Sequence, residues 1–362
     1  MRKPLGSRLE VALTMKLIIV TQKVDATDSN LGFFVRWVEE FSKHADITVI
    51  ANEVHKDAYG NIPKKVNIFS LGKEYGNSRF TRMRLYRKLL REQLPKADGI
   101  FFHMCPEYAL GAYWLPKRFG VKSVLWYVHK QVSVRLRLAR FLVDKIFTAS
   151  KESCRLRSNK VEVVGHGIDT ELFVPSPTAI VDPSKIRLLT VGRISPTKDI
   201  KTLILGFLEL KKRLSIPMRF TILGKPLTEQ DRAYERDLHA ICKRSSPDQF
   251  VWSYVSHDAI VSLYTNNDYG TTVFVHASKT GSMDKAVLEA LSAGLPVFSS
   301  SEAFVSVPGV QSFREGDPSD FAEKIATAFD KKELMLSEIG RTYVRKHHGL
   351  TALIDRIFTF YV

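Results

Sequence analysis

The sequence predicts an α/β protein made of two doubly wound domains in tandem, and three observations predict this class. Short β-rich segments alternate with helical patterns along most of the chain, which is typical of parallel sheets covered by helices on both faces. The segment ELFVPSPTAIVDPSK at 171–185 is rich in proline, has no strand or helix period and indicates a linker. The 362 residues are long for one hydrophobic core but comfortable for two.

The first series of elements precedes the linker and forms a predicted domain over 15–172. Its expected strands are KLIIVT from 16, DITVIA from 46, VNIFS from 66, DGIFFH from 98, KSVLWYV from 122, KIFTA from 145 and VEVVG from 161. Helical patterns lie between several of them, over 30–44, 79–94, 106–119 and 131–142. The alternation of the two patterns favours a parallel sheet.

The second series follows the linker, placed at 173–185, and forms a predicted domain over 186–345. Its expected elements are IRLLTVG from 186, a helix over 200–214, MRFTIL from 218, a helix near 229–244, QFVWSYV from 249, TTVFVHA from 271, a helix over 284–293 and LPVFSS from 295. Residues 346–362 include a last helix after Gly349 with apolar residues on one face, so it must dock. The spacing leaves open which domain it covers, the first domain being one candidate.

The N-terminal segment MRKPLGSRLEVALTMKLIIVTQK resembles a signal peptide only loosely. Lys16 interrupts its apolar stretch, and no A-x-A-like cleavage site follows. Met15 directly precedes a strong strand, which favours a translation start there over Met1 and an unstructured extension at 1–14. No segment approaches the roughly 20 apolar residues that cross a bilayer.

The composition, with 44% hydrophobic and 25% charged residues, is typical of a soluble globular protein. Cys105, Cys154 and Cys242 lack the paired spacing of a zinc site, which favours buried thiols in a reducing cytosol. The formal net charge of +16 is uneven: residues 1–175 hold 30 Lys and Arg against 17 Asp and Glu, and residues 176–362 hold 24 against 21. Such a field favours an anionic partner, which could be nucleic acid, a phospholipid surface or a phosphorylated substrate.

Several familiar motifs are missing from the sequence. There is no G-x-x-x-x-G-K-[ST], no G-x-G-x-x-G after a strand, no G-x-S-x-G and no H-E-x-x-H, so kinase, dehydrogenase, hydrolase and metalloprotease functions lose their usual support. No Asp-x-Asp pair offers a divalent metal site for a sugar diphosphate. The sequence also lacks the Cys and His spacing of a zinc finger, an RNP-like aromatic motif and a helix-turn-helix pattern. We therefore expect no nucleic-acid partner.

The segment TVGRISPTKDIKTLILGF at 190–207 offers two cations beyond the end of a strand. Arg193 leaves the strand after Gly192, and Lys198 lies just before a predicted helix. Ligands of open α/β sheets bind at this edge, and a planar guanidinium with a mobile ammonium suits a diphosphate. The alternative is that both residues are ordinary solvated cations beside a loop.

The segment SKTGSMDKAVLEALSAGLPVF at 278–298 joins a strand to a helix through small residues. Gly281 can bring its backbone close to a ligand, and the free amides at the helix start suit phosphate or sugar oxygens. Glu289 is an acid among small and apolar helix residues, where ribose hydroxyls would satisfy it. It could equally point to solvent or bond a backbone amide.

Other candidates lie in the first half of the chain. The loop DATDSNLGFF places Gly32 at a helix start after the first strand, as a possible phosphate cradle, although a simple N-cap by Ser29 or Asn30 explains it equally well. The strand ends FFHMCPEYAL and VLWYVHK are expected to aim three further side chains at one crevice. These side chains are His103, Glu107 and His129. A nearby histidine in VVGHGID is interpreted as part of a bend before the linker.

Together these segments resemble the group 1 retaining glycosyltransferases of the GT-B fold, glycosyltransferase family 4. VGRISPTKDIKTLILGF resembles the family's VGR…K…LI.AF signature, VLEALSAGLPVFSS its LEAMA.G.PV segment and VVGHGIDTELF its NGVD…F stretch. The resemblance runs from about Lys16 to the C-terminal helices. It implies two Rossmann-like domains facing a central cleft, the first binding the acceptor and the second a nucleotide sugar.

The resemblance also implies roles for single residues. Arg193 and Lys198 would bind the donor diphosphate and act in catalysis, and Glu289 would hold the ribose as the second acid of a Glu-x7-Glu motif. His129 matches a histidine near the donor sugar and acceptor, so it joins the two cations as a catalytic candidate. Gly32 matches one of two glycines in the first-domain loop, and the second glycine is missing here.

The sequence departs from the family at the first acid of that motif. The acid would fall at position 281, where this chain has Gly281, and Asp284 follows three residues later. We therefore expect backbone amides over 280–283 to contact the donor sugar. The residues involved are Thr280, Gly281, Ser282 and Met283.

The expected function is retaining transfer of a hexose-type sugar from a nucleoside-diphosphate sugar, without metal or cofactor. The acceptor would be a glycan or a lipid-linked molecule in surface polysaccharide or glycolipid synthesis. The alternatives are a nucleotide-sugar epimerase or a phosphorylase on the same fold, or a basic protein that binds nucleic acid or a membrane surface. His103 and Glu107 are the acceptor-side candidates.

The basic first half adds a hypothesis about location. Residues 79–96 and 130–140 are expected to form a cationic surface that rests on anionic lipid, which would place a cytoplasmic protein at the inner face of the membrane. The alternative is a solvated basic face with no membrane role.

Overall fold

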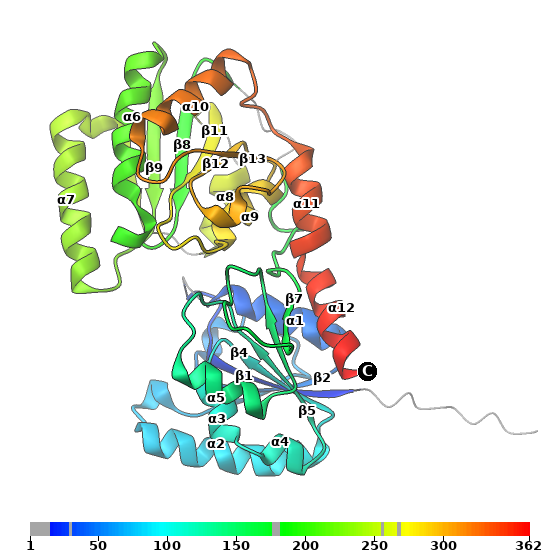
Figure 1. Ribbon diagram of the computed structural model, residues 1–362. Helices are drawn as coiled ribbons and strands as arrows, with labels where there is room; N and C mark the ends of the chain where they lie inside the picture. The colour runs from blue at the N-terminus through cyan, green and yellow to red at the C-terminus, as the bar shows by residue number, and fades with distance from the viewer. Residues whose placement is uncertain (1–14, 29–30, 176–181, 255–256, 266–268) are drawn as a thin grey trace, which may run out of the picture.

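The chain folds into two α/β domains, each built around one parallel sheet (Figure 1). The computed structural model describes residues 15–28, 31–175, 182–254, 257–265 and 269–362. The predictions about 1–14, about capping by Ser29 or Asn30 and about the middle of the linker lie outside the described residues. Among those described, the sheets have seven strands, ordered β3-β2-β1-β4-β5-β6-β7, and six strands, ordered β10-β9-β8-β11-β12-β13.

The first domain contains the predicted strands. They are β1 (Lys16–Val24), β2 (Asp46–Val54), β3 (Asn67–Ser70), β4 (Gly99–His103), β5 (Lys122–Trp126), β6 (Lys145–Thr148) and β7 (Val161–Val163). Alternate residues of β1 face opposite sides of the sheet, so Ile19 packs under helix α1 (Phe33–His44) and Ile18 under α2 (Arg79–Gln93) and α3 (Pro106–Ala112). Both faces of this strand are buried, which is why it reads as a continuous apolar run.

One predicted helix of this domain is divided in two. The segment expected to be helical over 106–119 forms α3 and a short α4 (Leu115–Arg118). Tyr113 between them has a φ of 51°, which an α-helix does not accommodate, and Pro116 then fits the first turn of α4. The fourth predicted helix is α5 (Val134–Leu142).

The second domain contains the predicted elements and three more. The strands are β8 (Ile186–Val191), β9 (Met218–Leu223), β10 (Phe250–Ser253), β11 (Thr271–His276), β12 (Val297–Ser299) and β13 (Val310–Ser312). The helices are α6 (Ile200–Arg213), α7 (Glu229–Ser245), α8 (His257–Thr265), α9 (Lys285–Ser292) and α10 (Pro318–Asp330), with short 3-10 turns η4 (Pro196–Lys198) and η6 (Glu302–Phe304) among them. The elements α8, α10 and β13 were not predicted. A signal for α10 was present, since Asp317 caps it and Pro318 begins it.

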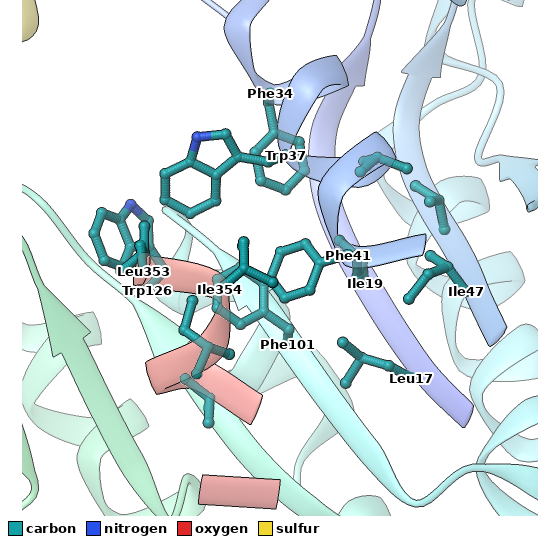
Figure 2. Packing of buried hydrophobic residues seen from close by; sticks show 14 of the residues in the cluster. Leu17, Ile19, Phe34, Trp37, Phe41, Ile47, Phe101, Trp126, Leu353 and Ile354 are labelled. Carbon is teal, nitrogen blue, oxygen red and sulfur yellow. The ribbon is translucent and has the colours of Figure 1, made fainter. Parts of the chain in front are cut away.

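The last two helices cross from the second domain to the first (Figure 1). α11 (Glu338–His348) packs on α9, and α12 (Leu350–Tyr361) packs on α1. Figure 2 shows Leu353 and Ile354 of α12 among the aromatic side chains of the first domain. The apolar face predicted from the sequence therefore completes the core of the N-terminal domain.

Candidate functional site

A cavity of about 450 Å³ is lined by residues of both domains at the carboxyl ends of their strands. The N-terminal domain contributes the end of β1 and the loop after it, and the C-terminal domain contributes the ends of β8 and β9 and residues beyond them. The charged and polar lining residues are Lys23, Asp25, Thr27, Asp28, Arg193, Lys225 and Tyr254. This is the edge at which open α/β sheets bind ligands.

Two glycines shape the C-terminal side of this cavity. The Gly192 amide donates to the Leu223 carbonyl at 2.9 Å, so β8 and β9 stay in contact beyond the sheet. A Cβ on Gly224 would lie 1.8 Å from the Gly192 oxygen, which no side chain tolerates. The close backbones bring Arg193 and Lys225 to the same cavity. Lys225 was not predicted, although ILGK repeats the strand-Gly-cation pattern of TVGR.

Lys198 and Asp284 form an ion pair at 2.5 Å beside this region. The same Asp284 oxygen accepts a hydrogen bond from His276 Nε2 at 2.6 Å, and the other ring nitrogen of His276 lies 2.9 Å from the Ser299 hydroxyl. Burial of the Asp284 carboxyl acts to raise its pKa, but Lys198 and His276 outweigh it and hold the pKa well below the usual range. Lys198 is therefore close to the loop at 278–284, but its ammonium group is already paired with the Asp284 carboxylate.

His276 is a site residue that the sequence analysis did not single out. It ends β11 at the same edge of its sheet that Arg193 leaves. The sequence offered one indication of this role, because His276 is the polar residue that ends the strand-like segment TTVFVH.

The loop at 278–284 is held through its carbonyl groups, partly by the N-terminal domain. Lys130 Nζ donates to the Thr280 carbonyl at 2.5 Å, and His166 Nε2 lies 3.1 Å from the Met283 carbonyl oxygen. Ser301 donates to the Ser282 carbonyl at 3.1 Å. His166 is thus more than part of a bend. Burial lowers its pKa to about 3, so the ring is neutral and donates through Nε2.

Gly281 has the left-handed conformation that its residue type allows, with a φ of 61°. A Cβ at this position would lie 2.3 Å from Oε1 of Glu302. Glu302 in turn pairs with Arg155 of the N-terminal domain at 2.5 Å. A carboxylate from another segment therefore occupies the space beside the position at which the family's first acid would begin.

Glu289 lies away from the residues that line the 450 Å³ cavity. It is buried on α9 and lines a small space together with Lys285, Phe33 and Trp37. The Lys285 ammonium sits 3.1 Å from the centre of the Phe33 ring. Burial lowers the pKa of Lys285 to about 7, although the charge of Glu289 opposes the shift. The assignment of Glu289 to a ribose stays a prediction.

The predicted residues of the N-terminal domain are only partly brought together. His103 does not face the crevice: it is fully buried, stacked on Phe34 at 3.7 Å between ring centres, because its strand end is covered by α1. His129 is exposed and directly precedes Lys130, which bonds the 278–284 loop. Glu107 is half-buried, pairs with Arg135 at 2.6 Å and lines a different cavity.

Gly32 is required by its backbone surroundings. A Cβ there would lie 2.6 Å from the carbonyl oxygens of both Ala26 and Asp28. The Gly32 amide donates to Asp28 at 2.9 Å, closing the loop before α1. These two carbonyl groups therefore require glycine at this position, and donor contact at Gly32 stays a prediction.

A charged network on this loop was not predicted. Lys23 Nζ lies 3.0 Å from Asp25, 3.0 Å from Asp28 and 3.3 Å from Glu53. Burial acts to lower the pKa of Lys23, but these carboxylates outweigh it and raise the pKa above its usual value. The N-terminal wall of the cavity is thus fixed by ion pairs opposite Arg193 and Lys225.

Comparison with known proteins finds a family match that lies largely within the second domain. Residues 179–341 match the family of glycosyl transferases group 1. A probable sucrose-phosphate synthase from Thermosipho melanesiensis is 26% identical over 141 residues. That match covers 39% of this chain and 32% of the relative, so the chain spans about a third of that longer protein.

Solved structures with the same architecture cover nearly the whole chain. Anabaena HepE in complex with UDP has a TM-score of 0.73 at 15% identity, over 96% of this chain and 99% of that one. A glycosyltransferase from Rickettsia africae has a TM-score of 0.70 at 14% identity, over 96% and 98%. The lipopolysaccharide outer core galactosyltransferase WaaB has a TM-score of 0.64 at 15% identity, over 96% and 100%. At these identities the likeness establishes the fold, which is GT-B.

Proposed function

We propose that this chain, which has the GT-B fold and carries a group 1 glycosyl transferase domain, moves a sugar from a nucleoside-diphosphate sugar to an acceptor hydroxyl. The observation that carries the proposal is the cavity between the domains. Its C-terminal wall lies within the matched segment and presents Arg193 and Lys225 beyond two glycine-ended strands. Anabaena HepE has been solved with UDP and with UDP-glucose, so a uridine diphosphate sugar is the first donor to test.

In the proposed reaction the cations stabilise the leaving diphosphate. Charge develops on the diphosphate as the glycosidic bond breaks, and preorganised donors at that position lower the barrier. Arg193 and Lys198 supply this charge, and Lys198 exchanges its Asp284 partner for the phosphate. The nucleoside diphosphate leaves on the face that the acceptor attacks, with the donor phosphate helping to deprotonate the acceptor hydroxyl, so the configuration is retained. His129 lies beside the sugar and acceptor.

We also propose that the transfer needs no metal, because the cationic side chains supply the positive charge. Activity that survives saturating EDTA is the expected result. Complete loss with EDTA and recovery with Mg²⁺ or Mn²⁺ would refute this part.

The test of the donor site is a thermal-shift panel with UDP, GDP, ADP and CMP on the wild type and Arg193→Ala. A ligand at about 100 times its Kd stabilises the domain that it binds by about 2.7 kcal/mol. We expect one base to give a clear shift that Arg193→Ala loses. Arg236→Ala, at an exposed position on α7 outside the cavity, should retain the shift. No shift with any nucleotide would refute the proposal.

For the acceptor we propose a glycan or lipid-linked molecule reached from an anionic membrane surface, at the inner face of the membrane. The surface of residues 79–96 and 130–140 combines basic residues with exposed apolar ones, among them Phe80 at 79% and Val134 at 71%, and the adjoining Phe141 is 56% exposed. Charge attracts such a surface to anionic lipid, and apolar side chains can enter the interface. No helix in the described part of the chain is long and apolar enough to span a membrane.

Flotation with phosphatidylglycerol vesicles at low salt tests this surface. We expect retention of the wild type, weaker retention of Phe80→Ser with Phe141→Ser, and none with phosphatidylcholine alone. Equal flotation of wild type and the double variant would argue against it.

A further inference from the structure

A second cavity, of about 320 Å³, lies in the N-terminal domain. Its lining comes from the ends of β1 and β2, from residues that follow β4, and from α2. Amides lie beside two arginines, Arg79 and Arg82, while the remaining wall is largely apolar. The polar uncharged lining residues other than tyrosine are Gln22, Asn52 and Cys105, and the aliphatic and aromatic ones are Leu71, Met83, Tyr86 and Tyr108.

Arg82 is held in this cavity by a chain of side-chain hydrogen bonds. Its Nη1 donates to the Asn52 amide oxygen at 2.6 Å. The Asn52 amide donates to Gln22 at 3.4 Å, and Gln22 donates to Cys105 Sγ at 2.8 Å. A guanidinium fixed on one side keeps its planar fork ordered for a ligand on the other, so little side-chain entropy is lost on binding.

The guanidinium is also incompletely satisfied. Its Nε is buried and has no hydrogen-bond partner among the described residues. Buried donors without an acceptor are rare and destabilising, so each one requires an explanation. A small rotation of Arg82 toward a bound carboxylate or phosphate would give Nε its acceptor in a two-point, charge-assisted contact.

The charge of the cavity agrees with an anionic ligand. Arg79 and Arg82 line it, and the one lining acid among the described residues is Glu107. The Glu107 carboxylate is already paired with Arg135 at 2.6 Å, so its charge is largely compensated. The lining therefore keeps a net positive charge within a domain that is itself strongly basic.

The cavity lies beside the proposed transfer site. Four neighbouring strands of the sheet are involved, in the order β2, β1, β4 and β5. Residues near the ends of β2 and β1, and residues that follow β4, line the cavity. Lys23, next to Gln22, lines the cavity between the domains. The loop after β5 carries His129 and Lys130, and Lys130 contacts the Thr280 carbonyl. Adjacent strands are about 4.8 Å apart, so an acceptor of sugar size can span from one cavity to the other.

We propose that this cavity binds an anionic group of the acceptor, a phosphate monoester or a carboxylate, through Arg82 and Arg79. The proposal rests on the proposed function, because it assigns the acceptor side of the same reaction. Two sources carry such a group: a soluble phosphorylated or acidic sugar, and a lipid phosphate headgroup. The anchored group fixes the orientation of the acceptor relative to the donor.

Calorimetric titration without a donor tests the soluble source. Glucose 6-phosphate, glucuronate and glucose are titrated into the wild type, Arg82→Gln, Arg79→Gln, the donor-site variant Arg193→Ala and the charge-matched Arg84→Gln. The last alters an exposed position of α2 outside the cavity. We expect an anionic sugar to bind the wild type and Arg84→Gln equally, and about 10–100-fold more weakly when Arg82 is lost, as for charged hydrogen bonds. Arg79→Gln should weaken binding as well, and neutral glucose should not bind.

Vesicles of equal charge test the lipid source. Phosphatidic acid presents a phosphate monoester and phosphatidylglycerol a diester, so a preference for the first that Arg82→Gln abolishes and Arg84→Gln keeps assigns the group to a lipid headgroup. If Arg82→Gln loses binding of the anionic sugar and the wild type shows no preference for phosphatidic acid, the anionic group belongs to a soluble acceptor.

Three results would overturn the proposal. They are binding unaffected by Arg82→Gln and Arg79→Gln, binding abolished only by Arg193→Ala, and no binding of any anionic sugar or vesicle preference. The UDP thermal shift is measured on every variant. A retained shift shows that the variant is folded, and it separates failure of this subsite from failure of the donor site.

Discussion

At the scale of single residues, the loop at 278–284 has a glycine, Gly281, at a position where the related motif has an acid. The missing side chain leaves room for the Glu302 carboxylate. The left-handed φ of 61° strengthens the requirement for glycine, since other L-residues are strained there. The family's side chain cannot be restored at this position without moving Glu302 from Arg155.

The first prediction concerns Gly281→Glu. Backbone strain and repulsion from Glu302 should lower the free energy of unfolding by about 2 kcal/mol. In a Glu302→Ala background the same change should cost less, because the clash and the like charge are gone. Chemical denaturation of the two single variants and the double variant measures the coupling. Strictly additive losses would show that Glu302 does not restrict this position.

The second prediction concerns Lys285, which lies over Phe33 beside Glu289 and near His103 and His166. Its pKa of about 7 in the folded chain is below the ordinary 10.5, so the unfolded chain binds more protons between these values. The cost of burying the ammonium is therefore full below about pH 7 and disappears as the pH rises toward 10.5.

Lys285→Met should consequently stabilise the protein most at about pH 6, by on the order of 2 kcal/mol, since the cost of burying the ammonium exceeds the lost attraction to Glu289 and to the Phe33 ring. The gain should shrink steadily above neutral pH. Melting curves at several pH values, with the exposed Lys88→Met as control, measure the difference. A difference that stays constant with pH would mean that Lys285 remains charged throughout.

At the scale of elements, the strands and most helices were predictable because hydrophobic periodicity and turn residues are local signals. The splitting of 106–119 was not, because it depends on the conformation of Tyr113. Arg193 follows β8 and Lys198 lies just before α6, at the positions along the chain that the sequence predicts, while their role in donor binding stays a prediction. The partners Asp284, Lys130 and Lys285 depend on contacts between distant segments, and the burial of His103 depends on the packing of α1.

The third prediction concerns α12, whose apolar face was predictable but whose docking site was not. Tyr361 is buried and donates a hydrogen bond to the Ile100 carbonyl at 2.8 Å. Tyr361→Ala should lower the stability of the N-terminal domain by about 3–5 kcal/mol, as for other large aromatic truncations. Tyr361→Phe should cost about 1–3 kcal/mol, because the Ile100 oxygen loses its donor.

Differential scanning calorimetry of these variants measures the effect, with the exposed Tyr75→Ala as the matched control. The N-terminal transition should move and the C-terminal transition should not. Equal shifts for Tyr361→Ala and Tyr75→Ala would contradict docking of α12 on the first domain.

At the scale of the whole molecule, several polar contacts between the two domains converge on one loop and its neighbour. Lys130 and His166 reach the 278–284 loop, and Arg155 reaches Glu302. Exposed ion pairs contribute little to stability and are screened by salt. The exposed Arg155–Glu302 pair can therefore influence the distance between the domains without locking them, which suits a cleft that must admit a donor and release a diphosphate.

The last prediction follows from this arrangement. Arg155→Glu places like charges opposite each other, so the cleft should open and donor affinity should fall about five-fold, the equivalent of about 1 kcal/mol for an exposed pair. Small-angle scattering should show a larger radius of gyration with an unchanged melting temperature. Combining it with Glu302→Arg restores opposite charges and should return both quantities toward the wild type. High salt should open the wild type in the same direction, because it screens the pair. If Arg155→Glu leaves the radius unchanged and the charge reversal has no effect, the pair does not control the cleft, and closure must depend on the contacts of Lys130 and His166.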